Sequence, residues 1–447
     1  MDYISNILID MRNIQKCIML KKFLYESSFY TVISDSTLFI KQLHYIFIKR
    51  RKKMASEQHS GLNLIIIAII ATSFLGDSIS GFNPVLDNIS DAFPDLSYTM
   101  VSLVATIPNV TFCIAALAIG AIVGKKMKYR TALTIGCLFI LIGGVIPAIF
   151  YKSFAVLMLS RLVFGLGLGS LVVINGYVSE VFEGKKRQKI LGWRVAAMNA
   201  GSVVVLLIAG ALGEIHWHVA AYSYLLAIIP LIFTFFIREP SEIKETDVET
   251  ETVRTKGKTK IEINVIIYCI IIIILTMALY GLLLIMSPFV VDNSLGSSTQ
   301  AGILLSLYTA GGAFGGLIFD KMRLVCKKYF ISCSCLMIIL GCALFYWSGS
   351  FLFIAIGSFI AGWGWYAIMT VYTELAAKQS NEASIALATS TIWIASCLGC
   401  FFGSFWMTGA QMIFGELYFG VIMSILIVFG LVAVIFLIKN PLRDEYR

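Results

Sequence analysis

The sequence predicts an all-α membrane protein whose twelve transmembrane helices form two six-helix pseudo-symmetric halves. Of its 447 residues, 58% are hydrophobic and 14% are charged, whereas soluble domains average about 45–50% apolar and about 25% charged residues. Apolar runs of about twenty residues recur along the chain, and each is long enough to cross a hydrocarbon core of roughly 30 Å. Glycine and charge motifs repeat between the halves. The composition therefore excludes a soluble or disordered chain.

The net charge and the cysteines exclude other classes of protein. The net charge is +9, but residues 1–53 contain ten Lys and Arg against four acids, so this excess predicts no nucleic-acid partner. Nearly all of the ten Cys lie in apolar runs, where cysteine packs as a small apolar residue. The pairs Cys333/Cys335 and Cys397/Cys400 have no His beside them, so we expect no metal site and no cofactor.

The first segment, residues 1–61, is predicted to be cytoplasmic. Residues 1–53 contain no apolar run long enough to span a membrane. A basic helix at the membrane surface is one interpretation. The other is that residues 1–53 are a mis-called start of a bacterial gene and that Met54, which precedes a short polar tail, is the true start.

Hydropathy places six spans before a polar segment and six after it. The first bundle covers residues 62–237 and the second covers residues 263–438, with a tail at 439–447. The linker between them, 238–262, has seven acids and six bases without apolar periodicity, which is typical of a solvated segment. The predicted spans are 62–84, 98–122, 131–150, 154–181, 191–213, 217–237, 263–291, 298–319, 329–347, 351–376, 384–408 and 414–438.

The distribution of basic residues predicts the orientation of these spans. One side of the membrane receives 22 Lys and Arg from the loops, the linker and the tail, and the other side receives Lys152 alone. Loops rich in Lys and Arg face the cytoplasm. We therefore expect a multi-pass protein of the cell membrane with both termini and the linker in the cytoplasm.

Two motifs recur at nearly equal offsets. Gly120-x-x-x-Gly124-Lys125 ends the second span and Gly316-x-x-x-Asp320-Lys321 ends the eighth, an offset of 196 residues. Glu180 closes the fourth span and Glu374 the tenth, an offset of 194 residues. These offsets indicate a duplicated six-helix unit with both copies in the same orientation.

With these motifs the chain resembles the major facilitator superfamily of transporters, over about residues 62–440. Gly316 to Lys321 match the opening of the family's motif between its second and third helices, and Arg161-x-x-x-Gly165-x-Gly167 matches its fourth-helix motif. Leu75-Gly76 followed by Pro84 resembles the first helix of bacterial drug/proton antiporters. Gly201 and Gly210 keep the spacing of the fifth-helix antiporter motif, although its Gly-Pro pair is missing.

Two charged residues are predicted to lie inside the membrane and to carry proton coupling. Asp77 lies roughly 22 Å along the first span and Arg161 roughly 12 Å along the fourth, at 1.5 Å per residue, so both fall at a similar depth. A charge at such depth is a functional candidate. We expect the two side chains to exchange partners during transport; the alternative is a permanent ion pair that joins the two helices.

Four further side chains are candidates for the substrate cavity, because the resemblance implies that helices 1, 4, 7 and 10 line it. Asn175 shares a face of the fourth span with Arg161, and it could instead bond a neighbouring helix. Tyr280, Trp363 and Tyr366 offer aromatic surface to a flat apolar or cationic ligand, or they serve packing alone.

The cytoplasmic ends of the helices are predicted to form a gate. Arg194 lies just inside the fifth span, and the pseudo-symmetry of the repeat brings Asp320 towards it. We expect an ion pair between them that closes the cytoplasmic side; simple anchoring of the loops is the alternative. The remaining residues assigned to this gate are Gly120, Lys125, Glu180, Gly316, Lys321 and Glu374.

At the outer side, His216 and His218 flank Trp217 beside Glu214. A pH sensor or a metal site is one interpretation, and an interfacial aromatic anchor is the other.

These features predict a monomeric secondary transporter in the lipid bilayer that moves a small-molecule substrate by alternating access. Since no G-x-x-x-x-G-K-[ST] loop occurs, the energy is expected to come from protons rather than ATP. Efflux of amphipathic compounds is favoured, and uptake of a sugar, organic acid or other nutrient is the alternative. A non-transporting sensor or scaffold on the same fold is the rival class. With four His and no catalytic constellation, an enzyme is not expected.

Overall fold

The computed structural model describes residues 58–240, 261–381 and 384–438. Residues 1–53, for which the sequence allows two interpretations, lie outside this range. Most of the linker and the tail lie outside it as well. The described residues from Ile65 onward pack into one compact unit. Throughout the described ranges the chain forms helices joined by short loops, with one isolated bridge between Val123 and Met127.

Within the described residues, eleven helical runs are long and apolar enough to cross a membrane. One of them, Ser298–Trp347, is 50 residues long. That run comprises two helices, α14 and α15, separated by the short turn Lys327–Tyr329, where Lys327 has a φ of +46°. Counting them separately gives the twelve transmembrane helices that the sequence predicts.

The helices of the first half begin with α3 (Gln58–Ser73) and end with α11 (Ile228–Thr234). Between these lie α4 (Leu86–Ala92), α5 (Tyr98–Thr106), α6 (Pro108–Ile122), α7 (Tyr129–Ile149), α8 (Phe154–Ser170), α9 (Ile174–Val181), α10 (Gly184–Gly213) and the 3-10 helix Trp217–Ala227. Several crossings combine two of these elements: α5 with α6, α8 with α9, and Trp217–Ala227 with α11.

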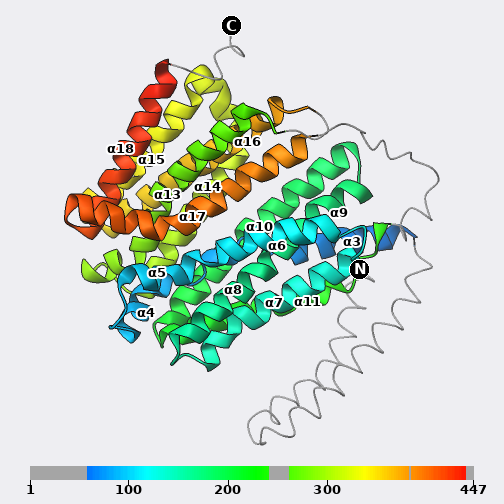
Figure 1. Cartoon of the computed structure of the whole chain (residues 1–447), viewed down its shortest axis with the longest axis horizontal. Coiled ribbons are helices and arrows are strands. Elements are labelled where there is room, and N and C mark those ends of the chain that lie inside the picture. The colour runs from blue at the N-terminus through cyan, green and yellow to red at the C-terminus, as the bar shows by residue number, and fades with distance from the viewer. Residues whose placement is uncertain (1–57, 241–260, 382–383, 439–447) are drawn as a thin grey trace, which may run out of the picture. The chain divides into compact units, whose positions relative to one another are not determined.

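The second half is more regular. Each of its six crossings is a single helix: α13 (Ile263–Asp292), α14 (Ser298–Cys326), α15 (Phe330–Trp347), α16 (Phe351–Lys378), α17 (Ile385–Phe414) and α18 (Leu417–Ile438). Helices α13, α14, α15 and α16 pack mainly with one another and with α17 and α18, and the corresponding helices of the first half pack likewise. Contacts between the halves come chiefly from α10 against α14 and from α5 and α6 against α17 (Figure 1).

The first crossing departs from the prediction of one continuous span at 62–84. It extends to Ala92 and is interrupted after Ser73, where two 3-10 turns, Ser78–Ser80 and Asn83–Val85, replace the α-helix. The local sequence explains the break, because Pro84 removes a backbone donor and glycines at 76 and 81 weaken the helix. Irregular backbone at membrane depth is tolerated where it is buried in protein or lines a cavity.

Candidate functional site

The seam between helices α5, α6 and α17 is a ladder of small polar side chains. The Thr99 and Thr408 hydroxyl oxygens are 2.6 Å apart, and those of Thr106 and Ser404 are 3.1 Å apart. One further rung along, the Cys113 thiol lies 3.9 Å from the Ile394 carbonyl oxygen. The helices run antiparallel. Successive contacts of α5 and α6 with α17 therefore lie closer and closer to the end of the bundle that carries the basic segments. We call that end the basic end, defined by the segments 124–128, 183–189 and 321–328.

A second seam joins α10 to α14 by close approach of their backbones. A Cβ on Gly210 would lie 2.7 Å from the Ser298 carbonyl oxygen, and a Cβ on Gly302 would lie 2.7 Å from the Leu206 carbonyl oxygen. Further along, the Ser306 hydroxyl donates to the Val203 carbonyl at 3.4 Å. Only glycine allows helices to approach this closely. The seam therefore depends on these two glycines.

Polar contacts reinforce this seam where α10 ends. The Glu214 carboxylate accepts a hydrogen bond from the Ser297 hydroxyl, and Ser297 also forms a capping box with Gln300 at the start of α14. Hydrogen bonds from Ser297 and Thr299 hold the pKa of the Glu214 carboxyl below its usual value. The ionised carboxylate thus favours contact between the halves here.

Helix α13 closes the same end against the first crossing. The Ser287 hydroxyl donates to the Pro84 carbonyl at 2.8 Å, and the Tyr98 hydroxyl donates to the Leu284 carbonyl at 2.7 Å. The Ser298 hydroxyl also bonds the Asn88 side chain. All these contacts join the first half to the second, and all lie away from the basic end. The end opposite the basic end is therefore sealed.

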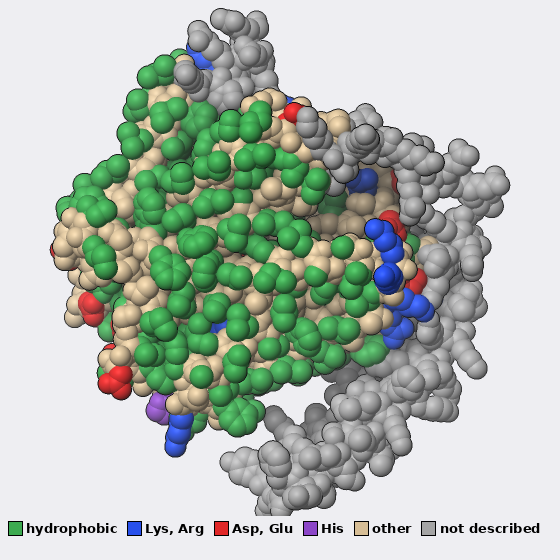
Figure 2. Space-filling model, in the orientation of Figure 1, with side chains coloured by type: hydrophobic (Ala, Val, Ile, Leu, Met, Phe, Trp, Pro, Cys, Tyr) green, Lys and Arg blue, Asp and Glu red, His purple; other side chains and the backbone are tan. Residues whose placement is uncertain are grey.

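The basic end is open. Gly120 and Gly316, the repeated motif glycines, are exposed, and a Cβ built on either would meet nothing within 4 Å. Figure 2 shows a hollow on this face beside a group of Lys and Arg side chains. Lys125 and Lys321, which follow the two motifs, are exposed as well. The two seams thus close the molecule at one end and leave the other accessible.

The residues assigned to the gate are engaged within their own halves in this conformation. Arg194 is buried and donates to the Asn175 side-chain oxygen at 2.8 Å, which places Asn175 beside a gate residue. Within the described ranges, Asp320 is exposed and forms no hydrogen bond or ion pair with Arg194. The structure therefore does not bring Arg194 and Asp320 together while the basic end is open, and their ion pair stays a prediction.

The two repeated glutamates also have partners within their own half. Glu180 accepts a hydrogen bond from the Tyr129 hydroxyl at 2.8 Å. Glu374 pairs with Arg323 and, at 2.8 Å, with Lys378. The sequence analysis did not single out Tyr129 or Arg323, although the position of Arg323 near the basic end was a signal.

Glu239 is a third residue for which the sequence predicted no role. Its carboxylate accepts hydrogen bonds from the backbone N–H groups of Tyr129 and Arg130, at 3.2 and 3.1 Å. These are the first residues of α7, whose preceding residue, Lys128, supplies no side-chain cap. A carboxylate at a helix N-terminus satisfies free donors and interacts favourably with the helix dipole. Glu239 therefore fixes the end of the first half to its third crossing.

Arg161 supports the interrupted first crossing. Its side chain is fully buried, and it donates from Nε to the Val104 carbonyl at 3.0 Å and from Nη2 to the Ile79 carbonyl at 2.9 Å. The guanidinium carbon also lies 4.3 Å from the Phe164 ring centroid and 4.8 Å from that of Phe82. These contacts satisfy a carbonyl that the broken helix leaves free and compensate the buried charge.

Asp77 lies at the start of the first 3-10 turn of the interrupted segment and is half-buried. Its carboxylate accepts a hydrogen bond of 3.3 Å from the Tyr366 hydroxyl of α16. This bond joins the first half to the second near the middle of both crossings. The structure thus pairs Asp77 with Tyr366, and Arg161, expected as its partner, bonds backbone carbonyls instead.

Glycines of α14 make room for the aromatic side chains of α16. A Cβ on Gly312 would lie 2.2 Å from the Tyr366 ring, and a Cβ on Gly315 would lie 2.6 Å from the Trp363 ring. Both rings are partly exposed. Tyr280 of α13 is buried beside Ser80 and Asn83 of the first crossing. Of the predicted cavity residues, Tyr280, Trp363 and Tyr366 belong to helices 7 and 10, and Tyr366 contacts Asp77.

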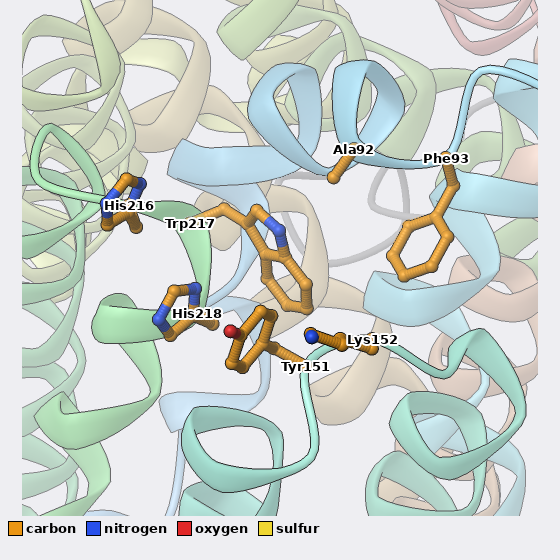
Figure 3. Close-up of a pocket in the computed structure, with 7 residues that line it drawn as sticks. All are labelled: Ala92, Phe93, Tyr151, Lys152, His216, Trp217 and His218. Carbon is orange, nitrogen blue, oxygen red and sulfur yellow. The ribbon is translucent and has the colours of Figure 1, made fainter.

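A separate pocket of about 520 Å³ lies at the sealed end, within the first half. The His218 ring stacks between Tyr151, with centroids 4.1 Å apart, and His216, with centroids 5.4 Å apart. Figure 3 shows the Lys152 amine pointing towards Tyr151 and Trp217. Among the described residues no three His, Cys, Asp or Glu are grouped to hold a metal. The stack fits an aromatic anchor, and a pH response of the two His stays a prediction.

Twelve apolar crossings, two antiparallel seams between the halves and one open end define a multi-pass membrane protein. The family model described as Major Facilitator Superfamily matches residues 64–404. The chain belongs to this superfamily. No curated protein matches the chain significantly in sequence.

Solved structures agree on the fold. The chain is similar to a single-site mutant of the nucleoside transporter NupG, with a TM-score of 0.65 at 14% identity over 83% of this chain and 99% of that one. It is also similar to a D-xylose-proton symporter, with a TM-score of 0.64 at 15% identity over 84% of this chain and 97% of that one. A bacterial homologue of the human lysosomal transporter Spinster, in an inward-facing conformation, has a TM-score of 0.59 at 16% identity, over 83% of this chain and 96% of that one.

Proposed function

We propose that the protein is a proton-coupled secondary transporter of a small molecule in the cell membrane, with both termini and the linker in the cytoplasm. The 22-to-1 distribution of Lys and Arg between the two sides supports this orientation. The basic end is then cytoplasmic, and the conformation described above is open to the cytoplasm and closed to the outside. Transport requires the alternative conformation, in which the two seams open outside and the basic end closes.

The hydrogen bond between Tyr366 and Asp77 carries the proposal of proton coupling. A carboxylate at this depth is costly and is retained where it serves a function. Hydrogen bonds to an ionised carboxylate are roughly twice as strong as neutral ones. Gain or loss of a proton at Asp77 therefore changes the strength of a contact between the two halves. Arg161 acts as a positioning residue, because it holds the segment that carries Asp77; the exchange of Asp77 and Arg161 as partners stays a prediction.

Closure of the basic end requires new contacts between the halves. Helices α10 and α14 run antiparallel, and Gly210 and Gly302 define their register. When this register is extended to the basic end, Arg194 lies opposite the helical turn from Gly316 to Asp320. We propose that Arg194 leaves Asn175 and pairs with Asp320 when this end closes. Gly120 and Gly316, which now face open space, then allow close approach of the helices.

Two directions of transport have support. The rings of Tyr280, Trp363 and Tyr366 favour the export of amphipathic compounds, as the sequence resemblance does. Uptake of a nutrient is the second candidate, because the solved structures to which the chain is similar include a D-xylose-proton symporter. A sensor on the same fold would bind its ligand without moving it across the membrane.

The test is transport of dyes, drugs and labelled nutrients in bacteria and in proteoliposomes that contain the full chain. We expect Asp77→Asn to abolish accumulation against a gradient while exchange of solute across the membrane continues. The matched control is Asp292→Asn, since Asp292 also accepts a hydrogen bond from a tyrosine, Tyr418, but at the sealed end within the second half. Accumulation that survives in Asp77→Asn would exclude Asp77 as the coupling residue, and accumulation that survives a protonophore would exclude proton coupling.

A further inference from the structure

Two cysteine side chains, one from each half, meet at the seam between α6 and α17. The Cys113 and Cys397 thiols are hydrogen-bonded to each other. The Cys113 thiol also lies 3.9 Å from the carbonyl oxygen of Ile394, which belongs to the same turn of α17 as Cys397. Both cysteines are free thiols. We call them the Cys113–Cys397 pair.

The register of the seam places this pair independently. The Thr106 and Ser404 hydroxyl oxygens, 3.1 Å apart, form the preceding contact. Cys113 follows Thr106 by seven residues, and Cys397 precedes Ser404 by seven residues. Seven residues are about two helical turns, so in antiparallel helices both steps lead to the same level and the same face. The pair is therefore the next contact between the halves towards the basic end.

The seam is narrow enough for a covalent bond between the two sulfur atoms. The polar atom of Ser, Thr and Cys is one bond away from Cβ, and the hydroxyl oxygens of the two preceding contacts are 2.6 and 3.1 Å apart. A disulfide requires Cβ atoms about 3.5–4.5 Å apart. Because the two thiols already contact each other, rotation of their side chains brings the sulfur atoms together without separating the halves.

The pair lies where the seam begins to open. Ser404 is fully buried, Cys397 is partly exposed, and Trp393, one turn further towards the basic end, is 51% exposed. These three residues share one face of α17, since their spacings of seven and four residues are close to whole turns. That face contacts the first half through Ser404, so its growing exposure follows the separation of the halves. A small reagent in the hollow at the basic end can therefore reach Cys397 (Figure 2).

We propose that the Cys113–Cys397 pair is an oxidation site, and that the disulfide formed there joins the two halves and holds the sealed end closed. Opening of the sealed end changes the angle between α6 and α17, whereas a disulfide restrains both the separation and the relative direction of the two Cα–Cβ bonds. The oxidised protein therefore stays open at the basic end. The proposal adds a regulatory modification and rests on the alternating conformations of the proposed function.

Hydrogen peroxide is the oxidant, and the reaction has two steps. The Cys397 thiolate, which is the more accessible, attacks a peroxide oxygen; the O–O bond breaks, and the hydroxide released takes up the thiol proton to form water and a sulfenic acid. The Cys113 sulfur then attacks the sulfenic sulfur, the S–S bond forms, the S–O bond breaks, and hydroxide leaves with the Cys113 proton as a second water. Two sulfur atoms are oxidised and one peroxide is reduced. Exchange with a low-molecular-weight thiol reverses the reaction.

The first measurement detects the bond. The full chain, with a protease site inserted in the linker, is treated with hydrogen peroxide in detergent and then cleaved. On a non-reducing denaturing gel the two halves of the oxidised protein should migrate together, and dithiothreitol should separate them. Cys113→Ser and Cys397→Ser should each abolish the link, and peptide mass spectrometry should identify the bonded cysteines.

Cys326 and Cys333 provide the matched control. Their thiols are also hydrogen-bonded to each other, but Cys326 ends α14 and Cys333 lies in α15, so both belong to the second half. A disulfide between them cannot join the halves, and Cys326→Ser should leave the peroxide-dependent link unchanged. Cys400, one turn from Cys397 on α17, tests the assignment: a link that persists in Cys397→Ser and disappears in Cys400→Ser would overturn the pair.

The second measurement detects the effect on the seal. Hydrogen–deuterium exchange of α4 and of the start of α14, which lie at the sealed end, should slow at least about tenfold after oxidation of the parent chain and should not change in Cys113→Ser. Absence of a link between the halves would overturn the oxidation site, and a link with unchanged exchange would overturn its effect on the seal. Neither measurement uses a substrate or a proton gradient, so failure of the proposed transport function is a separate result.

Discussion

The seam between α10 and α14 closes at one end and opens at the other, although both ends are rich in small residues. At the sealed end, Gly210 and Gly302 bring the two backbones together, and Glu214 bonds Ser297 across the seam. At the basic end, Gly192 and Gly316 face open space. We infer that glycine is needed at both ends because each end closes in a different conformation. In the structure the sealed end is the closed one. We therefore expect Gly192 and Gly316, which lie along the seam, to approach each other when the basic end closes.

Substitution of a seam glycine should give the largest effect. A Cβ in Gly210→Ala would lie 2.7 Å from the Ser298 carbonyl oxygen, and overpacking costs about 1–3 kcal/mol, so the closed-to-open ratio of the sealed end should fall roughly five- to a hundredfold. The measurement is disulfide formation between cysteines introduced at Thr99 and Thr408, whose hydroxyl oxygens are 2.6 Å apart, in a chain whose native cysteines are replaced.

Two alanine variants complete this comparison. Gly192→Ala is tolerated in the present conformation and should raise the same crosslinking yield, because it hinders closure of the basic end instead. Gly430→Ala, on α18 away from both seams, also meets nothing within 4 Å and should leave the yield unchanged. Equal yields in Gly210→Ala and Gly430→Ala would show that the glycine contact does not hold the seal.

Removal of the proposed ion pair at the basic end should have an intermediate effect. Asp320→Asn leaves this conformation intact, since Asp320 does not pair with Arg194 here, and weakens the closed basic end by about 0.2–1 kcal/mol, the range for an exposed ion pair. Crosslinking between cysteines introduced at Gly120 and Ser390, which the register of α6 and α17 places opposite each other, should fall roughly 1.4- to fivefold. A yield equal to that of the parent would exclude the Arg194–Asp320 contact as a latch.

Acid should weaken the sealed end slightly. The pKa of Glu214 is lowered by its hydrogen bonds to Ser297 and Thr299 across the seam, so the ionised carboxylate favours closure. That contribution is complete above the usual pKa of 4.5 and is lost as the pH falls through the lowered value. Crosslinking of the Thr99 and Thr408 positions should therefore decrease modestly below pH 4.5, and Glu214→Gln should remove this pH dependence. An unchanged acid response in Glu214→Gln would assign it to other groups.

The sequence predicts the number and approximate bounds of the crossings because the membrane requires long apolar helices. The predicted span at 62–84 was drawn as one continuous helix although residues 76–84 contain Asp, Ser, Asn, Gly and Pro. That polar stretch, with Pro84 and the glycines at 76 and 81, was the available signal for the break. The depth argument for Asp77 and Arg161 treats both helices as straight rods. Once the first crossing unwinds, its free carbonyls provide Arg161 with partners, and Asp77 faces the other half.

Which residues contact each other across the halves could not be predicted from one sequence. Asn175 was predicted either to contact the substrate or to bond a neighbouring helix, and it accepts a hydrogen bond from Arg194 of α10. Side-chain partners depend on tertiary packing, whereas crossings depend on local composition.

The partners of Arg161 also have a consequence for how the chain enters the membrane during synthesis. Insertion of an arginine at the centre of a helix costs about 2.5–3.5 kcal/mol. The carbonyls that accept its hydrogen bonds belong to Ile79 and Val104, which the ribosome makes before Arg161. When the fourth helix leaves the translocation channel, its charged group meets acceptors that are already in the bilayer. A truncated chain that lacks the first two helices should insert its fourth helix poorly.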